Sequence, residues 1–302
     1  MNGSRRSLLA VTALGTALFL ATSAAEAAYS PATTNGWFIF AGRVAGLNNS
    51  LFRTDVWLFN PETSFSTVTL TFREQVQSGA AAQTPINSAP IVLGPRETKF
   101  FSDVTFTSPI SAGDGKVGSL EWTSDRPIMG ASRVYTVATQ GSCVGTFGFF
   151  LPGIPTTESM GPKQSGLDSV NALQMYGVNT VDPNFRTNLD VTNTSSATVP
   201  IEVRVIDPVT NLLYGGVQNF SLAPKSLIRL GQIAAAVLPP PRDGLRITVA
   251  IRDGTIIPGD LGGILAVATT LDNRTNDAFA FTGQRQSGTI VPAVLLPLSD
   301  LQ

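Results

Sequence analysis

The residue types that carry most enzyme chemistry are scarce in this chain. Its 302 residues include no histidine and a single cysteine, Cys143. This composition excludes Ser-His-Asp and Cys-His nucleophilic sites, imidazole metal sites, histidine-ligated haem, and thiolate zinc or iron–sulfur sites. Carboxylate chemistry or a Ser-Lys pair remains, but no Ser-x-x-Lys motif occurs and the acidic residues are scattered over predicted turns. We therefore expect no catalytic residues, no cofactor, no metal site, and a protein that is not an enzyme.

Two segments that repeat each other carry the candidate binding residues. Residues 52–60 read Phe-Arg-Thr-Asp-Val-Trp-Leu-Phe-Asn, and residues 185–193 read Phe-Arg-Thr-Asn-Leu-Asp-Val-Thr-Asn. Arg53 and Arg186 occupy the same place in the two copies. A partner on the neighbouring strand is the simpler interpretation of these arginines, and an anion site is the other.

The two copies differ on the side of the strand opposite the predicted core. Trp57 and Phe59 of the first copy correspond to Asp190 and Thr192 of the second. Two aromatic side chains on such a face pack against another part of the chain, contact another protein, or stack on a sugar. The candidate interaction surface consists of Trp57, Phe59, Arg53 and Arg186.

Alternating apolar residues predict strands at both segments. Val56 and Leu58 alternate with polar or aromatic side chains, and Leu189 and Val191 keep the same phase in the second copy. Residues 67–73 also alternate, with threonine or arginine at every second position. A period of two is typical of strands with one buried face. The apolar sides of these strands are therefore the predicted core.

The repeat extends over nearly all of the chain after residue 35 and predicts two modules. Each copy contains roughly seven short apolar stretches separated by Gly, Pro, Asn and Asp turns, which favours sandwiches over helical folds. We therefore predict an all-β protein of two tandem antiparallel β-sandwich modules. The expected ranges are 35–155 for the first module, 156–166 for the linker, 167–290 for the second module and 291–302 for a C-terminal tail.

The chain resembles the duplicated immunoglobulin-like modules of secreted proteins from environmental bacteria. The resemblance rests on the Phe-Arg-Thr-Asp/Asn strand, the Asn turn that follows it, and the segment Asp272-Asn273-Arg274-Thr275 before the last predicted strand. It extends from Trp37 to Arg285. It implies an immunoglobulin-like architecture and export, and little chemistry, because the function of that family is largely uncharacterised.

The N-terminus has the features of an export signal. Arg5 and Arg6 precede an apolar run from Leu8 to Leu20, and small residues end at Ala27, the predicted last residue of a cleaved signal peptide over 1–27. The apolar run is short for a bilayer span. The paired arginines leave both the general secretory and the twin-arginine route open. We expect a periplasmic, cell-surface or extracellular protein with no membrane span in the mature chain.

Composition narrows the class of partner. Charged residues make up 14% of the chain, the formal net charge is −1, and no basic block occurs, so nucleic acid is a poor candidate. We expect an exported, non-enzymatic structural or interaction protein whose partner is another protein or a second copy of itself. A carbohydrate-binding module that uses exposed aromatic residues is the alternative, and a carboxylate-only hydrolase is the third hypothesis.

Overall fold

The computed structural model describes most of the chain between residues 31 and 286. The described residues are 31–47, 49–140, 143–161, 172–179, 184–233, 244–252, 255, 262–275 and 277–286. The predicted signal peptide, the predicted C-terminal tail and the end of the predicted linker lie outside these ranges.

The described chain is all-β, and its paired strands are antiparallel, which confirms the predicted fold class at this level. The helical element among the described residues is one short 3-10 turn, η1 (Thr156–Glu158). None of the helical structure described is long and apolar enough to cross a membrane.

The first half of the structure contains ten strands. They are β1 (Thr33–Gly42), β2 (Val44–Ala45), β3 (Leu51–Phe59), β4 (Ser66–Glu74), β5 (Ile86–Asn87), β6 (Ile91–Leu93), β7 (Thr98–Phe101), β8 (Val117–Gln140), β9 (Cys143–Pro152) and β10 (Ile154–Pro155). Strand β8 connects two layers. Its residues 117–124 pair with β1 and β4, and its residues 129–135 pair with β3. Pro127, which has no backbone N–H to donate, lies at the corner between these pairings.

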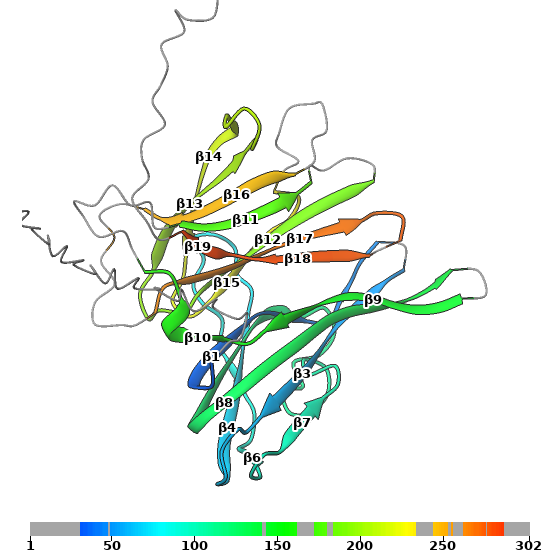
Figure 1. Ribbon diagram of the computed structural model, residues 1–302, viewed down its shortest axis with the longest axis vertical. Coiled ribbons are helices and arrows are strands. Elements are labelled where there is room, and N and C mark those ends of the chain that lie inside the picture. The colour runs from blue at the N-terminus through cyan, green and yellow to red at the C-terminus, as the bar shows by residue number, and fades with distance from the viewer. Residues whose placement is uncertain are drawn as a thin grey trace, which may run out of the picture.

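The two layers of the first half enclose one apolar core. Val56 and Leu58 of β3 face Leu70 of β4, Leu120 of β8 and Phe38 of β1 in a single buried cluster. The predicted phase of β3 and β4 is therefore confirmed. Figure 1 shows the long β8 running through this half, with β9 paired along its far end.

The second half contains two further sheets. Its strands are β11 (Ala172–Val178), β12 (Phe185–Asn193), β13 (Val199–Ile206), β14 (Leu213–Leu222), β15 (Leu227–Leu230), β16 (Leu245–Ile251), β17 (Ile264–Asp272), β18 (Ala278–Thr282) and β19 (Gln284–Gln286). One sheet has the order β14-β13-β16-β11-β19, and the other has the order β15-β12-β17-β18. Leu189, Val191 and Val203 lie in the core between them, as the alternation predicts.

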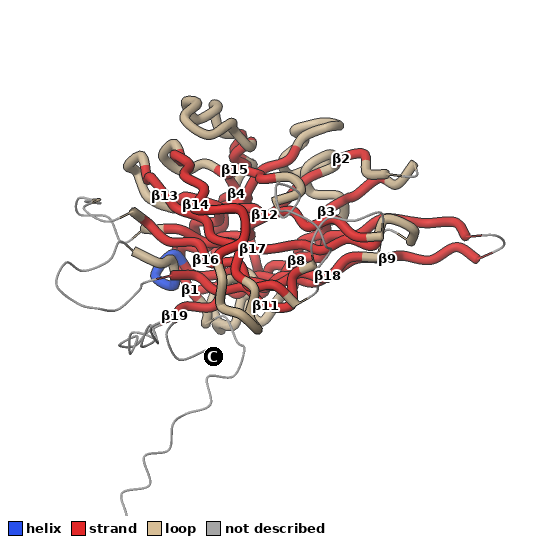
Figure 2. Tube along the Cα trace, turned by 90° about the horizontal axis from the view of Figure 1, so that it is seen from above, coloured by secondary structure: helices blue, strands red, loops and turns tan. Residues whose placement is uncertain are grey.

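A third apolar cluster lies between the halves, and we call it the joining cluster. Its members include Trp37, Ile39, Leu265 and Val267. Strand β1 reads Trp-Phe-Ile-Phe-Ala over residues 37–41, a continuous apolar run typical of a strand that is buried on both faces. Phe38 belongs to the core of the first half, whereas Trp37 and Ile39 pack with Leu265 and Val267 of β17. Strand β1 therefore lies between the core of the first half and the joining cluster that contacts the second half. Figure 2 shows the strands of both halves lying over one another, with the β8–β9 hairpin protruding at one end.

Hydrogen bonds to backbone carbonyls also cross between the halves. The N–H of Val76 donates to the carbonyl of Leu227 (2.8 Å), and the hydroxyl of Thr192 donates to the carbonyl of Ile39 (3.2 Å). The connection after β10 is packed as well. Met160 is buried in the second core and exchanges two backbone hydrogen bonds with Ile264. The described part of the predicted linker thus contacts both halves, because the hydroxyl of Thr156 accepts a hydrogen bond from the indole N–H of Trp37 (3.1 Å) in β1.

Candidate functional site

Three aromatic side chains form a surface on the outer face of the β7-β3-β8-β9 layer. Trp57 of β3 lies 4.9 Å from Phe100 of β7 and 6.1 Å from Phe150 of β9, measured between ring centroids. Phe100 is 52% exposed and Phe150 is 67% exposed. We call Trp57, Phe100 and Phe150 the aromatic face. The predicted outward direction of Trp57 is confirmed, although its neighbours cover part of the ring.

Strand pairing explains why these rings meet across three strands. Trp57 lies opposite Phe100 on one side and opposite Ala131 of β8 on the other. Because Ala131 has only a methyl group, the indole extends over β8 towards Phe150 on the next strand. Phe59 points to the same side of β3 and lies opposite Met129. Alternation along β3 therefore places both predicted aromatic residues on one face.

Charged residues border the aromatic face. The guanidinium carbon of Arg133 lies 5.7 Å from the centre of the Phe150 ring and 4.8 Å from that of Tyr135. Arg53 lies opposite Tyr135 in the strand pairing. Burial and the charge of Asp55 raise the pKa of Tyr135, while Arg53 acts in the opposite direction. Tyr135 is therefore the residue that the cross-strand interpretation of Arg53 points to, and the Nε of Arg53 has no hydrogen-bond partner among the described residues.

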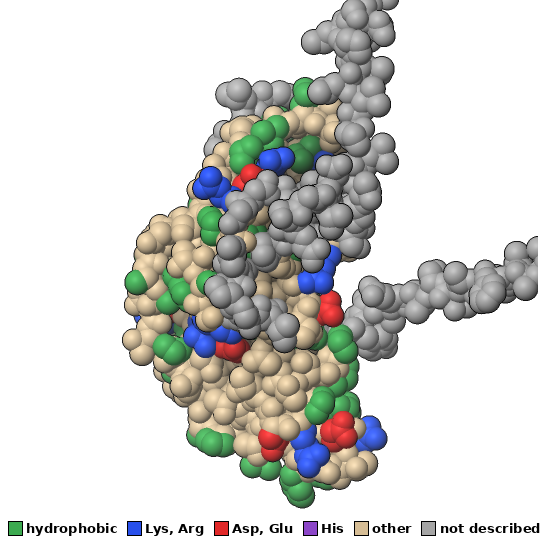
Figure 3. All heavy atoms as spheres, turned by 90° about the vertical axis from the view of Figure 1, so that its left-hand side faces the viewer, with side chains coloured by type: hydrophobic (Ala, Val, Ile, Leu, Met, Phe, Trp, Pro, Cys, Tyr) green, Lys and Arg blue, Asp and Glu red, His purple; other side chains and the backbone are tan. Residues whose placement is uncertain are grey.

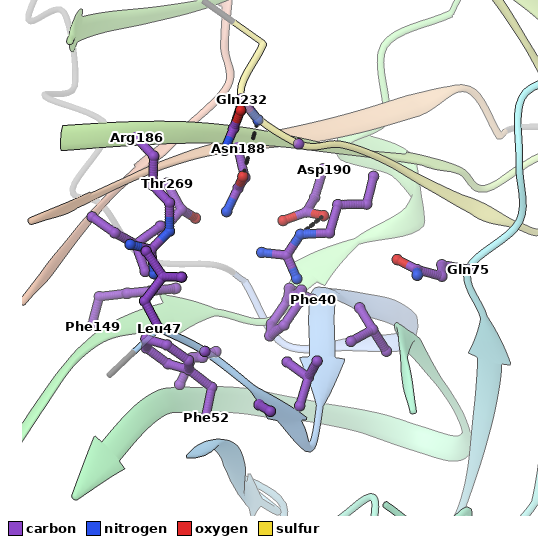
Figure 4. Close-up of a pocket in the computed structure, with 18 residues that line it drawn as sticks. Phe40, Leu47, Phe52, Gln75, Phe149, Arg186, Asn188, Asp190, Gln232 and Thr269 are labelled. Carbon is purple, nitrogen blue, oxygen red and sulfur yellow. Dashed lines mark hydrogen bonds and ion pairs between the residues drawn. The ribbon is translucent and has the colours of Figure 1, made fainter. Parts of the chain in front are cut away.

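The second predicted arginine lies in a different environment. Arg186 is buried at a cavity of about 560 Å³ between the two halves, and its guanidinium donates a hydrogen bond to the side-chain oxygen of Asn273. The structure therefore brings together Trp57, Phe59 and Arg53, and separates Arg186 from them. Figure 4 shows Arg186, Asn188 and Asp190 along one wall of the cavity, with Phe40, Phe52 and Phe149 facing them.

The cavity contains an unusual carboxylate. Asp190 is 1% exposed, and neither of its oxygens has a hydrogen-bond partner among the described residues. Its nearest opposite charge is Arg229, whose Nε lies 3.5 Å from Oδ1. Burial raises the pKa of Asp190, and Arg229 opposes that shift. Burial and the charge of Arg229 both lower the pKa of Arg186.

Sequence patterns predicted only some of the residues of the aromatic face and of the cavity. Adjacent phenylalanines at 100–101 and 149–150 give no indication of which ring points outward, so Phe100 and Phe150 were not predicted. Asp190 and Thr192 were expected on the face opposite the core, and they lie there, but both are buried because β1 packs over them. Arg229 lies in no sequence motif, so it was not predicted as a site residue. Its place beside Asp190 depends on the pairing of β12 with β15.

Charged residues are few in this chain, at 14% of the sequence. Figure 3 shows lysine, arginine and acidic side chains in small separate groups on one face of the molecule. Among the residues the structure describes, no three Cys, Asp or Glu side chains are placed to hold a metal ion. Comparison of the chain with protein-family models, curated proteins and solved structures finds no match.

Proposed function

We propose that this chain is an exported, non-enzymatic interaction protein that binds another protein through the aromatic face. The observation that carries the proposal is the exposure of Phe100 and Phe150 beside Trp57 on one sheet surface. Adjacent exposed aromatic side chains lose water when a partner covers them, and such residues supply much of the binding energy of protein interfaces.

We further propose that the chain consists of two tandem immunoglobulin-like β-sandwiches related by duplication. The strand orders of the two halves support this. Strands β4, β8, β1 and β10 are neighbours in the same order as β13, β16, β11 and β19, and β7, β3, β8 and β9 in the same order as β15, β12, β17 and β18. The repeated Phe-Arg-Thr segments lie at the start of the equivalent strands β3 (from its second residue) and β12 (from its first).

The orientation of the rings favours a protein partner over a sugar. The Trp57 ring is tilted by 32° against Phe100 and by 38° against Phe150. Rings that are tilted against one another form no continuous platform on which a sugar could stack, whereas a partner protein adapts its side chains to tilted rings. Arg133 adds a cation at the border of the face, which suits a protein interface with a polar rim.

The test compares a double variant of the aromatic face with a single control variant elsewhere, and every substitution replaces phenylalanine with serine. Phe100→Ser/Phe150→Ser removes two exposed rings from the aromatic face, and Phe65→Ser removes one of equal exposure, 66%, from the turn after β3. We expect the double variant to lose self-association in sedimentation velocity, or capture of its partner from the cell envelope, by at least tenfold. The Phe65 variant should keep wild-type association.

The outcomes separate the alternatives. Loss of binding on a glycan array by the double variant, with unchanged association, would favour the carbohydrate-binding module. Wild-type behaviour of the double variant in both assays would refute the proposed surface. Export is tested in the same strain, because cleavage of the predicted signal places the mature N-terminus at Ala28.

A further inference from the structure

We propose that the cavity between the two halves binds an organic acid with a single carboxylate head and an apolar body. The site lies apart from the aromatic face and is built by both halves of the chain. Its volume of about 560 Å³ falls within the usual range of small-molecule sites, roughly 300–1,000 Å³.

One wall of the cavity is polar because of strand alternation. Arg186, Asn188 and Asp190 occupy every second position of β12 and share one face. Arg229 lies directly opposite Asp190 on β15. The Asn188 side chain already accepts a hydrogen bond from the N–H of Gln232 (3.2 Å). The wall thus presents two guanidinium groups and one carboxylate, and the amides of Gln75 and Gln232 and the hydroxyl of Thr269 belong to the same lining.

The charges of this wall favour a monoanion. Two arginines and one aspartate give a net charge of +1 when all three are ionised, and the lowered pKa of Arg186 reflects repulsion from Arg229 in addition to burial. A carboxylate placed between the two guanidiniums would accept hydrogen bonds from both and relieve that repulsion. A cation would meet two like charges. A second carboxylate on the ligand would find no further cationic side chain in the described lining, so a single carboxylate fits best.

The unsatisfied state of Asp190 is the second observation that points to a ligand. Buried carboxylate oxygens are normally hydrogen-bonded, yet both oxygens of Asp190 lack a partner among the described residues. Burial favours its protonated form. A protonated Asp190 would donate a hydrogen bond to a bound carboxylate, so the same ligand would satisfy this group and both arginines.

The opposite wall suits an apolar body. Phe40 of β1, Phe52 of β3 and Phe149 of β9 lie across from the arginines (Figure 4), and Val134 of β8 lies in the same lining. Leu47, which is 50% exposed, also borders the cavity and is well placed at its mouth. An alkyl chain or aromatic ring that entered past Leu47 would lose its contact with water against these side chains.

Titration calorimetry with decanoate and decylamine on the full chain tests the proposal. We expect saturable 1:1 binding of decanoate and no comparable binding of decylamine, because the apolar bodies match and only the head charge differs. Arg186→Met should weaken decanoate binding at least tenfold by removing one guanidinium. Ala45→Trp should block it by filling the cavity from an exposed lining position.

Two controls define the result. Arg133→Met removes an arginine outside the cavity and should leave decanoate binding unchanged, and Asp190→Asn should not weaken it, because the amide retains a donor without the negative charge. If circular dichroism shows that Arg186→Met does not fold, the comparison of wild type with Ala45→Trp tests the proposal. Absence of saturable decanoate binding, or equal binding by wild type and Ala45→Trp, would overturn the proposal.

Discussion

At the scale of single residues, the carboxyl of Asp190 is expected to make stability depend on pH. Its pKa in the folded chain is raised above the ordinary value of 3.8 by burial. A raised carboxyl pKa means that the folded state holds the proton more tightly than the unfolded state. The associated stabilisation is therefore complete below pH 3.8 and is lost as pH rises through the folded-state pKa.

The variant Asp190→Asn removes this titration. We expect the free energy of unfolding of the variant to increase relative to that of the wild type as pH rises above 3.8. The increase should be about 1.4 kcal/mol for each unit by which the pKa is raised. Urea unfolding of both proteins across this pH range measures the difference. Glu158→Gln is the control, since that side chain is exposed on η1. A difference that stayed constant with pH would mean that Arg229 compensates the burial of Asp190 fully.

At the scale of elements, the alternation of β4 and β13 predicts where truncation is costly. Leu70 and Val203 are both fully buried in separate cores. Leu70→Ala should lower the free energy of unfolding by about 2–5 kcal/mol, and Val203→Ala by less, because fewer buried carbons are removed. Thr67→Ala, at an exposed position of β4, should change it by less than about 0.5 kcal/mol. Denaturant unfolding of the three variants would contradict the assigned strand phase if Thr67→Ala were the most costly.

Strand phase was predictable because it depends on neighbours in sequence. Val56 and Leu58 are buried because side chains alternate along any strand, and the apolar set had to face a core. The environment of the opposite face was not predictable in this way. Trp57 lies at a surface and Asp190 at a buried interface, although they occupy equivalent positions in the repeated segments, because only the second is covered by β1.

A further signal in β1 was present in the sequence. Its apolar run over residues 37–41 has no polar side, and a strand of this kind must be covered on both faces. That pattern predicts a packed neighbour without naming it. The partner, β17 with Leu265 and Val267, followed only from the tertiary structure, and the cavity beside it depends on how the two halves fit together.

At the scale of the whole molecule, the halves have separate cores and a shared apolar interface. Trp37 and Ile39 are fully buried only because the second half covers them. Val76, from the first half, reaches the second core. Separation at residue 155 would leave each core with nearly all of its residues and expose the joining cluster. The halves should therefore fold individually and bind each other when mixed.

Fragments 31–155 and 156–286 test this with an internal probe. All three tryptophans of the chain lie in the first fragment, so emission reports on that fragment alone. We expect each fragment to give a β-type circular dichroism spectrum, and addition of the second to shift emission of the first to shorter wavelength as Trp37 becomes buried. Val267→Asp in the second fragment should abolish the shift while leaving its own spectrum intact, because Val267 belongs to the joining cluster and not to the second core. Fragments that were unfolded alone and after mixing would show that neither core forms without the covalent chain between them, and the division into two modules would then be wrong.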